Sequence, residues 1–143
     1  MMNVKTIKWS RKSGVTILEI LIVLSIIALI AAVVGPRLIG YLGRAKTETA
    51  SLQVNQLRQT VQLFYIDVGR YPTDSEGLTV LLSAPAGEAS WAGPYLESAD
   101  GITDPWGRDF IYSEPKTVAD FSIQSLGRDG EKGGSGEDQD IGQ

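Results

Sequence analysis

The sequence contains no cysteine and no histidine among its 143 residues. Without cysteine the chain can form no disulfide, no thiolate metal site and no cysteine nucleophile. Without histidine it lacks the commonest general base and the commonest metal ligand of proteins. Any bound metal must therefore be held by oxygen atoms, which favours a hard cation such as calcium or magnesium. Since the sequence also offers no recognisable nucleophile–base arrangement, we expect that the protein is not an enzyme.

Charge is divided unevenly along the chain. The first fourteen residues hold four basic side chains and no acid, whereas the whole chain has a formal net charge of −4. The remaining residues therefore carry −8, the difference between −4 and the +4 of this head. An acidic body lacks the basic surface that phosphates require, so we expect no nucleic-acid partner. A basic head before an apolar segment is instead typical of a targeting signal. The four basic residues are Lys5, Lys8, Arg11 and Lys12.

One long apolar run, from Val15 to Val34, follows this head. It has twenty residues and a single charged side chain, Glu19. As a helix it would rise about 30 Å, which is roughly the thickness of the hydrocarbon core of a bilayer. Because the basic residues precede it, we expect a single membrane pass with the N-terminus in the cytoplasm. The alternative is a secretory signal peptide, for which Ala31 and Ala32 would supply a cleavage site.

The helix is expected to continue past the apolar run to a total of about 53 residues. Gly35-Pro36 predicts a kink or local melting, since proline removes a backbone donor and clashes with the turn before it. Apolar residues then recur at alternating spacings of four and three, which predicts one buried face. Gly69 and Pro72 predict the end of the helix. The residues of the buried face are Ala50, Val54, Leu57, Val61, Phe64 and Val68.

Shorter elements are expected after the helix. Thr73 and Glu76 have the spacing of a capping box ahead of a short helix with three inward-facing leucines. Segments 109–113 and 120–126 have the composition of strands, and the second alternates Phe121, Ile123 and Ser125 with other residues. The six residues between the two segments predict a hairpin-like connection. The inward-facing leucines are Leu78, Leu81 and Leu82.

The last seventeen residues, GRDGEKGGSGEDQDIGQ, contain six glycines and five acids. Composition alone predicts a disordered tail. The alternative is a calcium site, because glycine lets the backbone curl tightly and carboxylates supply oxygen ligands. The segment does not match the EF-hand pattern, so the residues by themselves leave both alternatives open. The acids considered for this site are Asp129, Glu137, Asp138 and Asp140.

The segment Ser13-Gly14-Val15-Thr16-Ile17-Leu18-Glu19-Ile20 resembles the processing motif of type IV pilins and pseudopilins. A basic leader and a glycine precede the apolar helix, and a glutamate lies five residues past the glycine. The resemblance implies that a prepilin peptidase cuts after Gly14 and methylates the new amino group of Val15, where the family usually has phenylalanine or methionine. It further implies that Glu19 pairs with the amino group of Val15 on a neighbouring subunit during assembly.

The soluble half resembles one branch of this superfamily, the major pseudopilins of type II secretion systems. The resemblance rests on motifs that occur in the order Arg70-Tyr71-Pro72-Thr73, Glu76-Gly77-Leu78, Gly93-Pro94-Tyr95-Leu96 and Asp104-Pro105-Trp106-Gly107, followed by the acidic tail. It implies an α+β fold, in which a long N-terminal helix packs on a small antiparallel C-terminal sheet. It also implies a calcium ion that holds the C-terminal loop. The implied ligands are the Leu126 carbonyl, Asp129, Ser135, Asp138 and Asp140.

The same resemblance implies an organisation of the chain. Residues 1–14 would be a cleaved leader, residues 15–36 the transmembrane and filament-core helix, and residues 37–143 a periplasmic domain. Within that domain we expect the helix to continue over 37–68, with a loop region at 69–108 and the sheet and calcium loop at 109–143.

The implied function is that of a structural subunit of the periplasmic pseudopilus, a helical homopolymer that drives export of folded proteins. Its expected partners are minor pseudopilins, the prepilin peptidase and an assembly platform in the bacterial inner membrane. Two alternatives are a type IV pilin subunit for adhesion or motility and a membrane-tethered calcium-binding module. Pilins commonly close their C-terminal region with a disulfide, which this chain cannot form. A calcium-binding module would not require Gly14 and Glu19.

Overall fold

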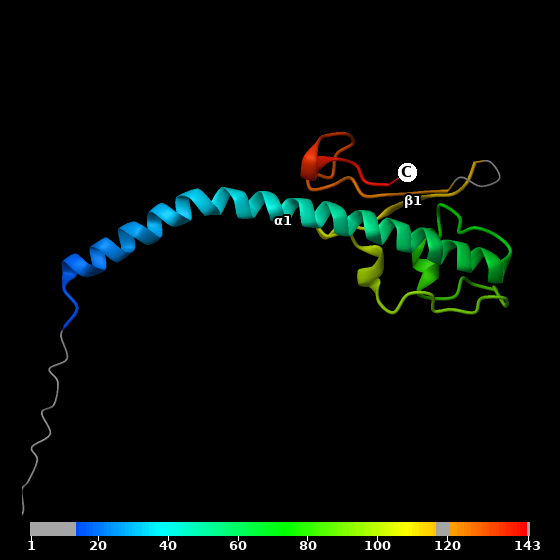
Figure 1. Cartoon of the computed structure of the whole chain (residues 1–143). Coiled ribbons are helices and arrows are strands. Elements are labelled where there is room, and N and C mark those ends of the chain that lie inside the picture. The colour runs from blue at the N-terminus through cyan, green and yellow to red at the C-terminus, as the bar shows by residue number, and fades with distance from the viewer. Residues whose placement is uncertain (1–13, 117–120, 143) are drawn as a thin grey trace, which may run out of the picture. The chain divides into compact units, whose positions relative to one another are not determined.

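The computed structural model describes residues 14–116 and 121–142 (Figure 1). The chain divides into two compact units, residues 1–38 and residues 39–143. A single helix, α1 (Ile17–Val68), contributes to both units and has 52 residues, close to the length expected. Of the predicted leader only Gly14 lies within the described residues. The predicted functional division into 1–14, 15–36 and 37–143 stays a prediction.

In the first unit, the apolar part of α1 has no buried side chain among the described residues. Ile17 is 83% exposed and Leu29 is 70% exposed, although both are strongly apolar. This part of α1 is long and apolar enough to cross a membrane. A helix that is apolar on every side requires lipid or other helices around it, because water solvates it poorly.

Of the two alternatives predicted at Gly35-Pro36, a kink or local melting, local melting is not observed. Both residues belong to α1, and the helix is continuous through them. Proline removes one N–H donor from the helix, whereas the turns before and after it keep their own hydrogen bonds. Loss of one donor is therefore compatible with a continuous helix.

In the second unit, the predicted face of α1 is confirmed. Its first five members are 0–4% exposed, and the sixth, Val68, packs against them while half-buried. The helix ends as expected at Gly69, which has a φ of +80° and donates its N–H to the Tyr65 carbonyl at 2.8 Å. Such a left-handed glycine is a common way of ending a helix.

The sheet is smaller than expected. Strands β1 (Ile111–Ser113) and β2 (Ser122–Gln124) pair antiparallel, with Tyr112 opposite Ile123. The expected alternation in the second strand segment is confirmed, since Phe121, Ile123 and Ser125 are buried. Residues flanking the two strands pair elsewhere, in isolated bridges between Thr103 and Asp109 and between Ser125 and Ile141. The fold is therefore α+β, with one long helix and a small antiparallel sheet.

The described residues of the second unit also form three short 3-10 helices: η1 (Gly77–Leu81), η2 (Ala99–Ile102) and η3 (Gly136–Asp138). The reciprocal hydrogen bonds of the predicted capping box are present, but they close the turn at 73–76, and η1 itself begins at Gly77 with Glu76 as its N-cap. The Thr73 N–H donates to the Glu76 carboxylate at 2.9 Å, and the Glu76 N–H donates to Thr73 Oγ1 at 3.3 Å. Of the three leucines expected to face inward, Leu78 and Leu81 are buried and Leu82 is half-buried.

The core of the second unit joins α1 to η1, to the sheet and to Ile141 near the C-terminus. Its buried apolar residues are Ala50, Val54, Leu57, Val61, Phe64, Leu78, Val80, Leu81, Phe110, Phe121, Ile123 and Ile141.

Candidate functional site

Gly14 and Val15 precede α1 and are exposed. Among the described residues, a Cβ added at Gly14 would meet nothing within 4 Å. This part of the fold therefore imposes no requirement for glycine at position 14. A requirement for glycine at this position would have to come from another molecule that approaches the backbone closely.

Glu19 lies in the first turn of α1, where the helix dipole favours an acid. The Glu19 N–H donates to Thr16 Oγ1 at 3.2 Å, and the Ile20 N–H donates to the Thr16 carbonyl at 3.2 Å. Thr16 thus caps the helix, a role that we did not predict although Thr16 and Glu19 have capping-box spacing. Within residues 14–116 and 121–142, no cation pairs with the Glu19 carboxylate. A cation that pairs with Glu19 would have to come from outside the described residues.

The acidic tail forms a closed loop and not the disordered segment that its composition predicts; it is the orange-to-red segment of Figure 1. Ser125 and Ile141 exchange two backbone hydrogen bonds of 2.9 Å, and the Arg128 N–H donates to the Glu137 carbonyl at 2.8 Å. Ile141 is 9% exposed and belongs to the core. The Glu137 side chain lies against Gly43 of α1, where a Cβ would collide with it. We call residues 125–141 the C-terminal loop.

Two close approaches fix the start of this loop. Arg108 donates to the Gly127 carbonyl and to the Arg128 carbonyl, both at 2.8 Å. Gly127 has a φ of +65°, and a Cβ there would lie 2.7 Å from the Glu137 carbonyl oxygen. Glycine is therefore required at position 127 by both the backbone angle and the available space.

The predicted calcium ligands all lie in the C-terminal loop. Asp129 Oδ1 accepts the Glu131 N–H at 3.1 Å, and Asp140 Oδ2 accepts the Gly133 N–H at 3.0 Å. The Asp138 carboxylate accepts two hydrogen bonds from Arg128, at 2.8 and 2.9 Å. Ser135 is exposed and precedes η3, and Leu126 is half-buried.

The loop meets part of what a calcium site needs. Its donors are carboxylates, a hydroxyl and carbonyls, the oxygen ligands that calcium takes. Asp140 Oδ1 is buried and has no hydrogen-bond partner within the described residues, so this oxygen could coordinate a cation. The described part of the chain nevertheless holds no group of three acidic side chains close enough to share a metal. The ligand types fit calcium, whereas the carboxylates do not converge in this conformation.

Asp104 is a structural residue that we did not predict. It is 5% exposed and accepts the Ser125 hydroxyl at 2.6 Å. Its other oxygen accepts the N–H groups of Trp106 and Arg108, at 3.0 and 2.9 Å. This carboxylate therefore joins the turn at 104–107 to the start of the C-terminal loop. Trp106, which belongs to the same Asp104-Pro105-Trp106-Gly107 motif, packs against the core while half-buried. The sequence signal that could have indicated this role of Asp104 is the Asp-Pro pair, which is common at the start of a turn.

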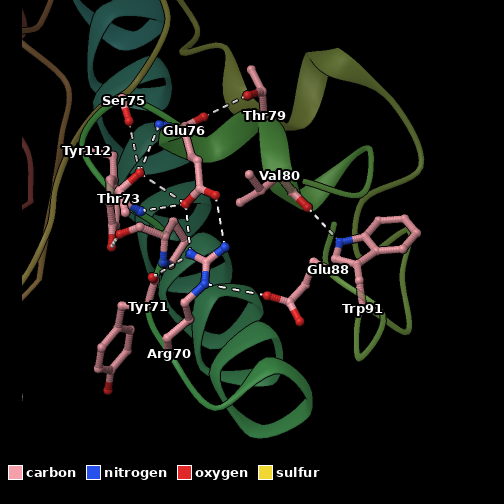
Figure 2. Close-up of polar contacts among 11 residues, drawn as sticks. Arg70, Tyr71, Thr73, Ser75, Glu76, Thr79, Val80, Glu88, Trp91 and Tyr112 are labelled. Carbon is pink, nitrogen blue, oxygen red and sulfur yellow. Dashed lines mark hydrogen bonds and ion pairs between the residues drawn. The ribbon is translucent and has the colours of Figure 1, made fainter. Parts of the chain in front are cut away.

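A second polar cluster lies where α1 ends, and Figure 2 shows the Glu76 and Glu88 side chains pointing toward Arg70. Arg70 donates two hydrogen bonds to the Glu76 carboxylate, at 2.8 and 2.9 Å, and lies 3.5 Å from Glu88. The Arg70 bonds, followed by that from the Thr73 N–H, lower the pKa of Glu76 from 4.5 to about 2. The cluster holds the loop after α1 in place, and nothing in it resembles a catalytic pair.

Two family models match the chain. The model described as type II secretion system, protein G, matches residues 37–143, and that described as the prokaryotic N-terminal methylation motif matches residues 9–35. Together they cover the second unit, the apolar part of α1 and the last part of the predicted leader.

Individual proteins agree with these models. The type II secretion system core protein G of Xanthomonas campestris is 35% identical over 130 residues, which cover 91% of this chain and 88% of the relative. The protein of the same name from Pseudomonas aeruginosa is 33% identical, covering 92% of this chain and 94% of the relative.

A solved structure agrees as well. The crystal structure of the major pseudopilin from the type 2 secretion system of enterohaemorrhagic Escherichia coli is similar, with a TM-score of 0.56 and 28% identity. The match covers 73% of this chain and 87% of that chain. The matches to its second unit, to its N-terminal motif and to its fold show that the chain belongs to the type II secretion system protein G family.

Proposed function

We propose that this protein is the repeating structural subunit of a type II secretion pseudopilus, polymerising through its N-terminal helix to drive export of folded proteins. The single observation that carries the proposal is the apolar part of α1, which is exposed on every side within the chain. Such a surface needs lipid before assembly and neighbouring helices after it. A head-to-tail contact that does not close then produces an open helical fibre.

Membership in this family implies assembly with other components of the secretion system. We propose that these include minor pseudopilins, the prepilin peptidase and an assembly platform in the inner membrane. The role is structural and not enzymatic. The family match supports a pseudopilin over the type IV pilin alternative, as does the absence of cysteine.

The proposed location before assembly is the bacterial inner membrane, with the N-terminus in the cytoplasm and the second unit in the periplasm. The basic residues ahead of the apolar run support this orientation, because positive charge is retained on the cytoplasmic side. The second unit would then lie in the periplasm, where the assembled filament would act.

Processing is proposed at Gly14 and Val15. The match of residues 9–35 to the N-terminal methylation motif supports cleavage after Gly14 and methylation of the Val15 amine. The open surroundings of Gly14 support recognition by an external enzyme.

Glu19 would set the register between subunits by pairing with the Val15 amine of a neighbour. A carboxylate at the edge of an apolar helix usually has such a partner, and none exists within the described residues. We expect Glu19→Ala to be cleaved normally but to enter sheared filaments poorly, as measured by immunoblot. Glu48→Ala, which removes an exposed acid from the soluble part of α1, is the matched control. Normal incorporation of Glu19→Ala would reject the pairing.

We also propose that the C-terminal loop binds calcium. The Leu126 carbonyl, Asp129, Ser135, Asp138 and Asp140 would hold the ion, which would offset repulsion among the acids and stabilise the closed loop. The free, buried oxygen of Asp140 supports this proposal. Chelation should lower the melting temperature, and calcium should restore it better than magnesium, which tolerates irregular cages poorly. Asp129→Ala should abolish this response, and a wild-type melting curve indifferent to chelator and calcium would refute the site.

A further inference from the structure

The C-terminal loop already contains a cation of its own, the guanidinium of Arg128. Arg128 Nε lies 2.8 Å from Asp138 Oδ1, and Arg128 Nη2 lies 2.9 Å from Asp138 Oδ2. Both carboxylate oxygens are thus engaged in a bidentate pair, the strongest common geometry for these groups. The Glu137 carboxylate lies 3.9 Å from Arg128 Nη1 and adds a longer contact.

The backbone at the same place is also bridged. The Arg128 N–H donates to the Glu137 carbonyl at 2.8 Å. Arg128 therefore links the outgoing and returning arms of the C-terminal loop through both its main chain and its side chain.

The side-chain pair lies at the surface and can exchange. The side chain of Arg128 is 57% exposed and that of Asp138 is 30% exposed. Water reaches both groups, so the pair can open even though its geometry is bidentate. Arg108, by contrast, donates to the Gly127 and Arg128 carbonyls and holds the loop backbone. Arg128 is thus the arginine whose side chain competes for a proposed calcium ligand.

We propose that Arg128 is a built-in counter-ion of the C-terminal loop, which holds Asp138 when calcium is absent and gives it up when calcium binds. This inference rests on the calcium site proposed above. The guanidinium uses one lone pair on each oxygen of Asp138, which leaves fewer for a metal, and its positive charge opposes entry of a cation. Arg128 therefore weakens calcium binding and stabilises the metal-free loop.

The test compares the full chain in detergent micelles with two variants, Arg128→Gln and Lys132→Gln. Each variant removes one positive charge from the C-terminal loop, but Lys132 is exposed and has no ion pair within the described residues. Calorimetric titration with calcium chloride gives the affinity, and thermal unfolding in chelator gives the stability of the metal-free protein. We expect Arg128→Gln to bind calcium about two- to fivefold more tightly, the range of an exposed ion pair, and to melt earlier in chelator. Lys132→Gln should change both quantities much less.

Three results would overturn the inference. Equal changes in the two variants would mean a general effect of charge. Unchanged or weaker calcium binding by Arg128→Gln would mean that Arg128 does not compete. If neither the wild type nor Arg128→Gln binds calcium, the calcium site and the exchange both fail. The assembly role of Glu19 is measured separately and would stand in all three cases.

Discussion

Alanine substitutions at Gly127 and Gly136 test whether the C-terminal loop has the fold described. The two glycines have nearly the same backbone angle, with φ of +65° and +67°. Their surroundings differ. A Cβ at position 127 would lie 2.7 Å from the Glu137 carbonyl oxygen and 2.9 Å from that of Gln139, whereas a Cβ at position 136 would meet nothing within 4 Å. The pair therefore separates the cost of the angle from the cost of the contact.

The expected magnitudes follow from these two terms. A left-handed angle costs alanine about 1–2 kcal/mol, and the lower entropy of the unfolded chain returns about 0.4–1 kcal/mol. Gly136→Ala should thus lose about 0–1.6 kcal/mol. At position 127 the obstructing atoms are backbone oxygens, which cannot move without disturbing the Arg128–Glu137 hydrogen bond. Overpacking of this kind adds about 1–3 kcal/mol, so Gly127→Ala should lose about 1–3 kcal/mol more than Gly136→Ala.

Urea unfolding of the detergent-solubilised chain, followed by tryptophan fluorescence, measures the difference, because Trp106 packs against the core. With a slope of about 1–2 kcal/mol per molar urea, the midpoint of Gly127→Ala should lie about 0.5–3 M below that of Gly136→Ala. Equal shifts for the two variants would refute the closed loop, because an open tail would not crowd position 127.

Two further substitutions test the polar clusters. Glu76→Gln should lose about 1–2 kcal/mol at pH 7. The deficit should vanish as the pH falls from 4.5 to about 2, since the folded protein lowers the pKa of Glu76 over that interval and the wild type then loses this stability as well. Urea unfolding at pH 7 and pH 3 checks this, and a constant deficit would contradict it. Ser125→Ala should cost about 1–3 kcal/mol by removing the hydroxyl bonded to buried Asp104. The exposed control Ser51→Ala should stay within about 0.5 kcal/mol, and equal losses would contradict the role of Ser125.

The elements that the sequence predicted well depend on neighbouring residues. The buried face of α1 follows from spacings of three and four, and the end of α1 follows from Gly69. The reciprocal bonds between Thr73 and Glu76 span three residues. Each of these signals is contained in one or two turns of chain, so a single sequence is enough to show it.

The features that were missed depend on residues far apart in the sequence. Strand pairing stops short of the predicted ends because Asp109 pairs with Thr103 and Ser125 pairs with Ile141. The C-terminal loop is closed by contacts such as that between Arg108 and Gly127, nineteen residues apart. Composition cannot reveal such contacts, which is why six glycines and five acids predicted disorder. The ligand types of the loop were visible in the sequence, whereas the capture of Asp138 by Arg128 was not.

The central claim is that the apolar part of α1 remains in the finished protein and exchanges lipid for the helices of neighbouring subunits. Mass spectrometry of the protein purified from membranes tests this claim most directly. The account predicts a chain that begins at Val15, carries one added methyl group and keeps residues 15–34. A mature chain that begins near Ala32 and is found free in solution would contradict it.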